Sequence, residues 1–193
     1  MTRMILASIE GEYRRYRALA ERALDQLSDE ELGVCRGEGD NAVAVVVKHL
    51  GGNLRSRFTD FLTSDGEKPW RDREAEFGPP VADRDALLQI WKRGWDCLFA
   101  ALEGLQDLDL AATVTIRRQP LTVAVALHRS LAHASYHVGQ IVHLARALRG
   151  VNWTSLSIPP GGSEAYSANP AHERGEDHAD TLLRSQDKAR PQD

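Results

Sequence analysis

The sequence predicts an all-α domain built as a four-helix bundle. Apolar residues recur at three- and four-residue steps in four separate stretches, which is the pattern of an α-helix with one buried face. Several of these stretches begin at a capping residue or end at a glycine. The connections between them are long enough to cross a bundle, so functional groups would project inward from facing helices.

The first predicted helix runs to about Leu27, and a short capped turn follows at Ser28 to Glu31, where the spacing fits a capping box. The second begins at Asn41 as N-cap and extends to about Leu62. Gly51 and Gly52 weaken it by about 1 kcal/mol each, but two glycines inside a helix also permit a neighbouring backbone or a ligand to approach closely.

The residues from 63 to 82 form a long connection, rich in charge, Gly and Pro, that shows no period. Connections beyond about 12–15 residues are usually functional or disordered, and Trp70 and Phe77 indicate that this one packs against something. Asp83 is the predicted N-cap of the third helix, which ends near Leu105.

The last predicted helix spans 121 to 149 and contains four of the chain's seven histidines. A brief extended segment at 114–116 precedes it, Pro120 and Thr122 open it, and Gly150 is its C-cap. An ordered coil at 150–170 is expected to lie on the bundle. The domain is therefore assigned to residues 1–168, and the polar tail at 169–193 is expected to be disordered.

Composition narrows the class of function. A formal net charge of −4 and a pI near 6.0 give no general attraction to nucleic acid or to anionic lipid. The longest strongly apolar run, AVAVVV, is far shorter than the ~20 residues of a membrane span, and the N-terminus has no signal-peptide pattern. Cys35 and Cys97 are interpreted as free thiols. We expect a soluble, cytoplasmic protein without a nucleic-acid or membrane partner.

The histidines carry the chemical prediction. His133 and His137 are four residues apart, so their rings lie about one turn apart on one helix face. His49 lies among apolar residues of the second helix, and a buried ring there needs a partner. Together they would form a three-imidazole metal site with an open position, as in catalytic zinc sites. We expect zinc first, although nickel, iron and copper also accept imidazole ligands. The alternative is that the three histidines are ordinary hydrogen-bonded residues without a metal.

These residues resemble a known family. His49, a long crossover and the HxxxHxGQI motif from His133 to Ile141 are similar to the DinB-like (DinB/YfiT) superfamily of metal-binding four-helix bundles. The phrases GEKPWRDRE and SIPPGGSEAY resemble one of its uncharacterised branches, and the resemblance covers about residues 1 to 168. It implies an up-down-down-up bundle, a homodimer, and a divalent metal held by His49, His133 and His137.

Other side chains are candidates for supporting roles. Asn53 and Gln140 lie about one helical turn from a histidine and could orient a ligand ring or a bound water. The alternative is that each is a simple polar residue at the edge of the core. Trp70 and Trp153 could line the pocket mouth, although Trp is more often simply buried. The run Arg71, Asp72, Arg73 and Glu74 is interpreted as a solvated loop, with recognition of a charged substrate group as the alternative. Tyr136 does not share the face of His137 and is interpreted as a packing residue, and His128 and His143 as surface residues.

Three functions remain open at this stage. The resemblance favours transfer of a low-molecular-weight thiol such as bacillithiol or mycothiol to an electrophile, with the metal lowering the thiol pKa from about 8.5. A metal-dependent hydrolase is the first alternative, but no Glu or Asp lies at a helical step from His133 or His137 to act as base. A non-catalytic, metal-binding dimeric bundle of sensor or stress-associated type is the second.

Overall fold

A computed structural model describes residues 3–79 and 83–170 of the chain. These residues are mainly helical, as predicted. Their α-helices are α1 (Met4–Leu24), α2 (Asp29–Leu32), α3 (Val43–Phe58), α4 (Arg73–Glu76), α5 (Arg84–Glu103), α6 (Val123–Arg149) and α7 (Ser163–Ala168). Two 3₁₀ turns, η1 (Asp107–Ala111) and η2 (Gly150–Asn152), and one two-stranded sheet complete the described part.

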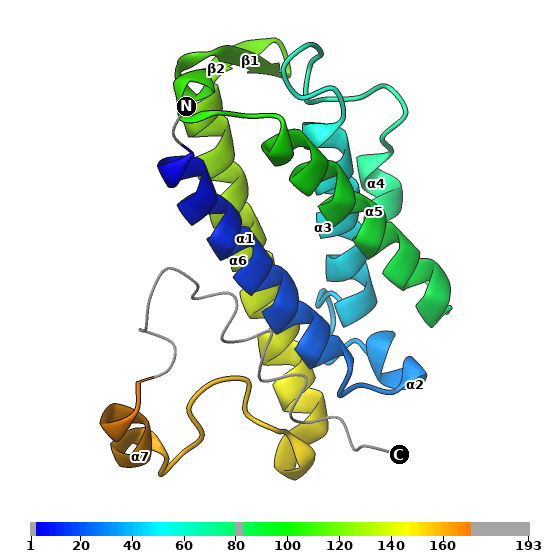
Figure 1. Cartoon of the computed structure of the whole chain (residues 1–193). Helices are drawn as coiled ribbons and strands as arrows, with labels where there is room; N and C mark the ends of the chain where they lie inside the picture. The colour runs from blue at the N-terminus through cyan, green and yellow to red at the C-terminus, as the bar shows by residue number, and fades with distance from the viewer. Residues whose placement is uncertain (1–2, 80–82, 171–193) are drawn as a thin grey trace.

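Four long helices lie side by side and bury their apolar faces in one core (Figure 1). The helix α6 packs along α1 and also contacts α3, which packs along α5. In Figure 1, α1 and α6 run in one direction along the bundle, and α3 and α5 run in the other. Because α3 and α5 are parallel, the chain must return along the whole bundle between them, and this return includes α4.

The helices α3 and α5 cross with their backbones in contact. A Cβ atom on Gly51 would lie 2.8 Å from the carbonyl oxygen of Ile90, and one on Gly94 would overlap the backbone of Gly51. Any larger residue would force the helices apart, so the predicted close approach at the glycine pair is confirmed.

The boundaries of α3 differ from the prediction. Its N-cap is Ala42 rather than Asn41, and it ends at Phe58 rather than near Leu62. The chain leaves the helix at Thr59, and Asp60 then adopts a positive φ of 50°. Phe61 nevertheless remains buried. Loop residues that pack on the core therefore extended the helical pattern beyond the real end of the helix.

The segment before α6 forms an antiparallel hairpin of β1 (Thr113–Ile116) and β2 (Gln119–Thr122). The extended segment was predicted, but its partner strand was not. The turn residues Arg117 and Arg118 both have positive φ, a conformation that sequence reasoning expects at Asn-Gly or Asp-Gly. Here the Asp65 carboxylate accepts hydrogen bonds from both turn amides, at 2.8 and 2.7 Å, and holds the turn from outside.

Several local predictions are confirmed. Ser28 and Glu31 form a capping box, and Asp83 and Thr122 cap α5 and α6 through their side chains. Gly150 is the C-cap of α6, with a φ of 53°. Cys35 and Cys97 are free thiols.

The region after α6 is mostly irregular, as predicted, but it also contains η2 and α7. Leu156 is buried there, and Trp153 packs half-buried against the core. The predicted disordered tail lies outside the described residues from 171 onward. Within the described ranges, no helix is both long enough and apolar enough to cross a lipid bilayer.

Candidate metal centre

Three histidines from two helices meet at the edge of the core, with His49 buried and His133 and His137 half-buried. The Nε2 atom of His133 lies 3.3 Å from Nε2 of His49 and 3.1 Å from Nε2 of His137. The potential ligand atoms all lie within 4.8 Å of one another, and among the described residues no carboxylate or cysteine joins this group. The spacing of His133 and His137 within α6 and the packing of α3 against α6 produce this arrangement.

The buried His49, 5% exposed, has the partner that its environment requires. Its Nδ1 atom lies 2.9 Å from Oε2 of Glu76, at the end of α4. A carboxylate only accepts, so Nδ1 of His49 carries the hydrogen and its Nε2 faces the cluster. The sequence-based expectation of a buried, partnered His49 is thus correct, and the partner comes from the long connection.

Glu76 is itself held by an arginine. Arg71 donates from Nε and Nη2 to the two carboxylate oxygens of Glu76, both at 2.8 Å, and from Nη1 to Ser56 at 3.3 Å. Only 2% of the Arg71 side chain and 8% of the Glu76 side chain are exposed. The prediction that Arg71 belongs to a solvated loop is therefore wrong, because a bidentate ion pair replaces its contacts with water.

Glycine makes room for this network. A Cβ atom on Gly52 would overlap Oε1 of Glu76. Burial opposes ionisation of Glu76, but the hydrogen bonds from His49 and Arg71 outweigh it and lower the pKa of the carboxyl group. Glu76 is therefore a carboxylate at neutral pH and accepts the His49 hydrogen.

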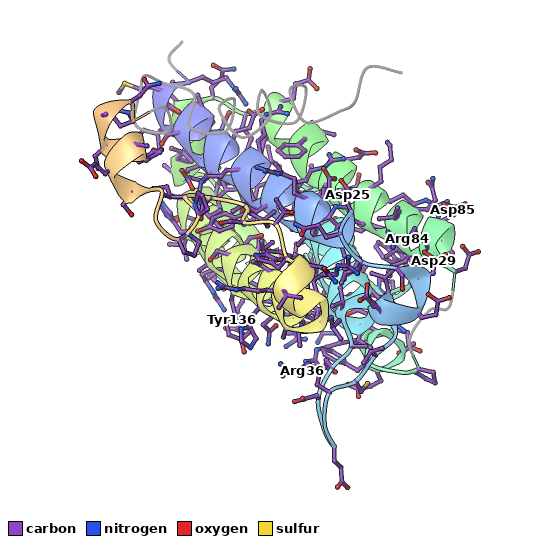
Figure 2. All side chains as sticks on the ribbon, turned by 90° about the horizontal axis from the view of Figure 1, so that it is seen from below. Asp25, Asp29, Arg36, Arg84, Asp85 and Tyr136 are labelled. Atoms are coloured by element: carbon purple, nitrogen blue, oxygen red, sulfur yellow. The ribbon has the colours of Figure 1, made fainter. Side chains whose placement is uncertain are left out.

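The α6 side of the cluster is supported differently. Nδ1 of His137 lies 2.7 Å from Oε1 of Gln140, so this ring also points a lone pair inward. Gln140 contacts a ligand candidate as predicted, whereas Nδ1 of His133 is buried without a hydrogen-bond partner among the described residues. Tyr136 is 63% exposed and extends from the outer side of α6 (Figure 2), so it is not part of the core, but its ring meets the His137 ring edge-on.

The donor set fits a divalent metal ion. A tetrahedral zinc ion with Zn–N distances of about 2.0–2.1 Å separates its nitrogen ligands by roughly 3.3–3.4 Å. The Nε2 separations of His133 from His49 and from His137, 3.3 and 3.1 Å, are close to this value. When the rings are neutral, His49 and His137 carry their hydrogens on Nδ1. Only His133 can then place a hydrogen between the three Nε2 atoms. A cation offsets the remaining lone-pair repulsion better than that hydrogen does.

Burial and neighbouring charges keep the His133 and His137 rings neutral. Burial, with the neighbouring His137, His49 and arginine side chains, lowers the pKa of His133 to about 4. Burial also lowers the pKa of His137, although its hydrogen bond to Gln140 opposes the shift. Neutral imidazole is the form that binds metal, so both rings are ready to act as ligands at physiological pH.

A cavity of about 480 Å³ lies beside the cluster, and His49 and His133 form part of its wall. Asn53, predicted to orient a ligand ring, lines this cavity, and among the described residues no hydrogen bond joins its side chain to a histidine ring. Trp70 and Trp153 do not line it. Trp70 is 48% exposed and packs under the guanidinium of Arg55, 4.5 Å from the ring centre.

The described fold and site define a helical protein with a three-histidine group that could hold a metal ion. The chain belongs to the family described as protein of unknown function DUF1572, whose model matches residues 1–162. No curated protein and no solved structure matches the chain.

Proposed function

We propose that this protein is a divalent-metal-dependent enzyme of DinB-like, up-down-down-up four-helix architecture that transfers a low-molecular-weight thiol to an electrophile. The convergence of three imidazoles through Nε2 carries the proposal. Three protein ligands leave a position for a substrate, whereas a structural zinc site normally fills four positions with protein atoms. The open cavity on the His49 and His133 side gives a substrate access to that position.

The chain's own residues prepare the site. Glu76 and Gln140 accept the Nδ1 hydrogens of His49 and His137, which fixes the tautomer and orientation of both rings. The apolar side chains of Phe58, Phe61 and Leu121 exclude water from part of the cavity wall. Such a wall favours reaction with the thiol over reaction with water.

When held by the three Nε2 atoms, a divalent ion would lower the pKa of a thiol at its remaining position from about 8.5 toward neutrality. The thiol proton passes to solvent, the sulfur lone pair forms a bond to the electrophilic carbon, and the leaving group departs with its bonding electrons. Glu76 does not serve as the base, because it is bound to the outer nitrogen of His49 and to Arg71. Hydrolysis would require a base, so thiol transfer is preferred over it.

The first test is the metal content of untagged protein. We expect about one equivalent of zinc, nickel or iron in the wild type, and loss of the ion in His49→Ala and in His133→Ala, because each removes one of three ligands. His128→Ala is the matched control, since His128 is exposed on the same helix as His133. Metal absent from the wild type would contradict the proposed site.

The second test is turnover by metal-loaded protein. Bacillithiol, mycothiol and glutathione are each incubated with an aryl chloride, and chloride release is measured. Chloride release that disappears in His137→Ala supports thiol transfer. Hydrolysis of an aryl ester, without chloride release from the aryl chloride, would overturn thiol transfer and favour the hydrolase alternative. Metal binding without either activity, together with a large drop in melting temperature in His137→Ala, would favour the non-catalytic bundle. Light scattering tests the expected homodimer.

A further inference from the structure

We propose that the cavity beside the histidines binds an organic anion, and that the exposed Arg129 contacts its carboxylate. The inference rests on the proposed function where it assigns this anion as the electrophilic substrate of the metal site. Its physical basis is the composition of the cavity wall, which combines several arginines with apolar side chains and, among the described residues, contains no carboxylate.

The cavity wall is positively charged. Every charged side chain that lines it is an arginine, and the set is Arg57, Arg71, Arg73, Arg117 and Arg129. These arginines come from α3, the connection before α4, α4 itself, the hairpin and α6, so the charge is gathered by tertiary structure. Five guanidinium groups around one cavity repel one another, and an anion inside it would relieve that repulsion.

Four of the five arginines have acidic partners that do not themselves line the cavity. Arg71 forms a bidentate ion pair with Glu76. Glu67 is shared between Arg57, at 3.3 Å, and Arg117, at 2.8 Å. Arg73 pairs with Glu74 at 3.3 Å on the surface, where an ion pair contributes little and is easily exchanged. Two arginines on one carboxylate leave part of the positive charge unbalanced.

Arg129 differs from the other four. Within residues 3–79 and 83–170, no hydrogen bond or ion pair engages its side chain. It is exposed on α6 and lies four residues before His133, so it shares a helix face with a metal-ligand candidate. A guanidinium binds a carboxylate through two parallel hydrogen bonds, so Arg129 is suited to fix one end of a substrate whose other end reaches the histidines.

The apolar part of the wall indicates an organic acid rather than an inorganic anion. Five apolar side chains line the cavity: Phe58, Phe61, Ile116, Leu121 and Ala126. A volume of about 480 Å³ is within the usual range for small-molecule sites. The expected ligand therefore has a carboxylate at one end and an apolar body, with the reactive carbon near His49 and His133.

The test compares acids with alcohols of the same carbon skeleton. Benzoate, phenylacetate and 3-phenylpropionate, each paired with its alcohol, are titrated into metal-free and metal-loaded protein, and binding is followed by ligand-observed NMR. At least one acid is expected to bind the metal-free wild type more tightly than its alcohol. Arg129→Gln should weaken that acid about tenfold through loss of a charge-assisted hydrogen-bond pair. Arg146→Gln, an exposed arginine of α6 outside the cavity, should have no effect.

The outcomes separate this inference from the proposed function. Failure of all three acids to bind, equal binding of acid and alcohol, or equal affinities of wild type and Arg129→Gln would overturn the anion site. Acid binding that requires the metal and ignores Arg129 would also overturn it, while leaving the metal site intact. Arg129-dependent binding by a protein that never takes up metal would leave the anion site and overturn the proposed enzyme.

Discussion

The two sides of the histidine cluster are built in contrasting ways. On the side of α3 and α4, His49 is buried and hydrogen-bonded to a carboxylate that a buried arginine holds with two further bonds. On the α6 side, His137 depends on one neutral, partly exposed amide, and Nδ1 of His133 has no hydrogen-bond partner within the described part of the chain. The HxxxH spacing thus brings ligands together, but the rigid support lies on the other side.

This difference teaches that a site's recognisable motif and its rigid part need not coincide. A charged, fully paired network holds a ring in one orientation, because any movement would strand buried charges. A partly exposed amide can exchange its hydrogen bond for water at little cost. The α3–α4 side should therefore respond strongly to substitution, and the α6 side weakly.

The largest expected effect is at Glu76. Glu76→Ala should lower the free energy of unfolding by about 3–5 kcal/mol, because Arg71 would remain buried without its counter-charge. Zinc affinity should fall about 10–100-fold through loss of the His49 support. Urea unfolding and competition with a chromophoric chelator measure the two effects. The control is Glu74→Ala, which removes an exposed pair and should change stability by less than about 0.5 kcal/mol.

Substitutions at two glycines, Gly52 and Gly139, test the same support sterically. Gly52→Ala places a methyl group against Glu76 and should destabilise the fold by about 1–3 kcal/mol while weakening metal binding. Gly139→Ala, next to Gln140 in α6, meets no atom within 4 Å and should stabilise the helix by up to about 1 kcal/mol. Thermal unfolding with and without zinc distinguishes them. Equal responses would show that Glu76 can move aside freely.

The pH dependence of the metal-free protein sharpens the comparison on the α6 side. The folded-state pKa of His133 is about 4, below its ordinary value of 6.5, so the unfolded chain binds the proton more readily. Stability should therefore fall as pH decreases from about 6.5 toward about 4, and His137 should contribute in the same direction. Urea unfolding in chelator between about pH 6.5 and 5 measures this slope above the range in which carboxylates titrate.

Replacing His133 by Gln should flatten that slope, whereas His128→Gln, on the exposed face of α6, should leave it unchanged. Identical slopes in wild type and His133→Gln would mean that the ring is not protonated more easily after unfolding. The shift would then have no effect on stability.

The smallest expected effect is at Gln140. Gln140→Ala removes the acceptor of His137 but strands no charge, so stability should change by less than about 0.5 kcal/mol. Metal affinity should decrease by about tenfold at most, the lower end of the range for such supporting residues. The same chelator competition applies. A loss larger than that of Glu76→Ala would reverse the proposed ranking of the two sides.

Sequence reasoning predicted the parts of the site that depend on local periodicity. The facing positions of His133 and His137, the contact of Gln140 with His137 and the burial of His49 all follow from helical spacing and apolar neighbours. The helical class followed in the same way. Each helix packs one face against the core, and this produces a local period of apolar residues that can be read from a single sequence.

The missing parts depend on contacts between distant segments. Glu76 lies in a stretch without period, and only the return of the chain beside α3 places it against His49. Two sequence signals were nevertheless present. Glu76 stands between the apolar residues Ala75 and Phe77. Gly52, three residues after the buried His49, has no side chain and leaves space beside it. The arginine cavity gave no such signal, because its members come from segments that only the fold assembles.

The backbone contact of Gly51 with Gly94 has a consequence for how this scaffold can vary. Helices that touch through side chains can slide past one another by rotamer changes, but two touching backbones have one permitted axial offset. Gly51 lies two residues beyond His49 and on roughly the opposite face of α3, so this joint sets the height of the ring independently of the cavity wall. Exchanging the hairpin at 113–122 for another of different length would then change which molecules the cavity admits, while the placement of His49 is inherited unchanged.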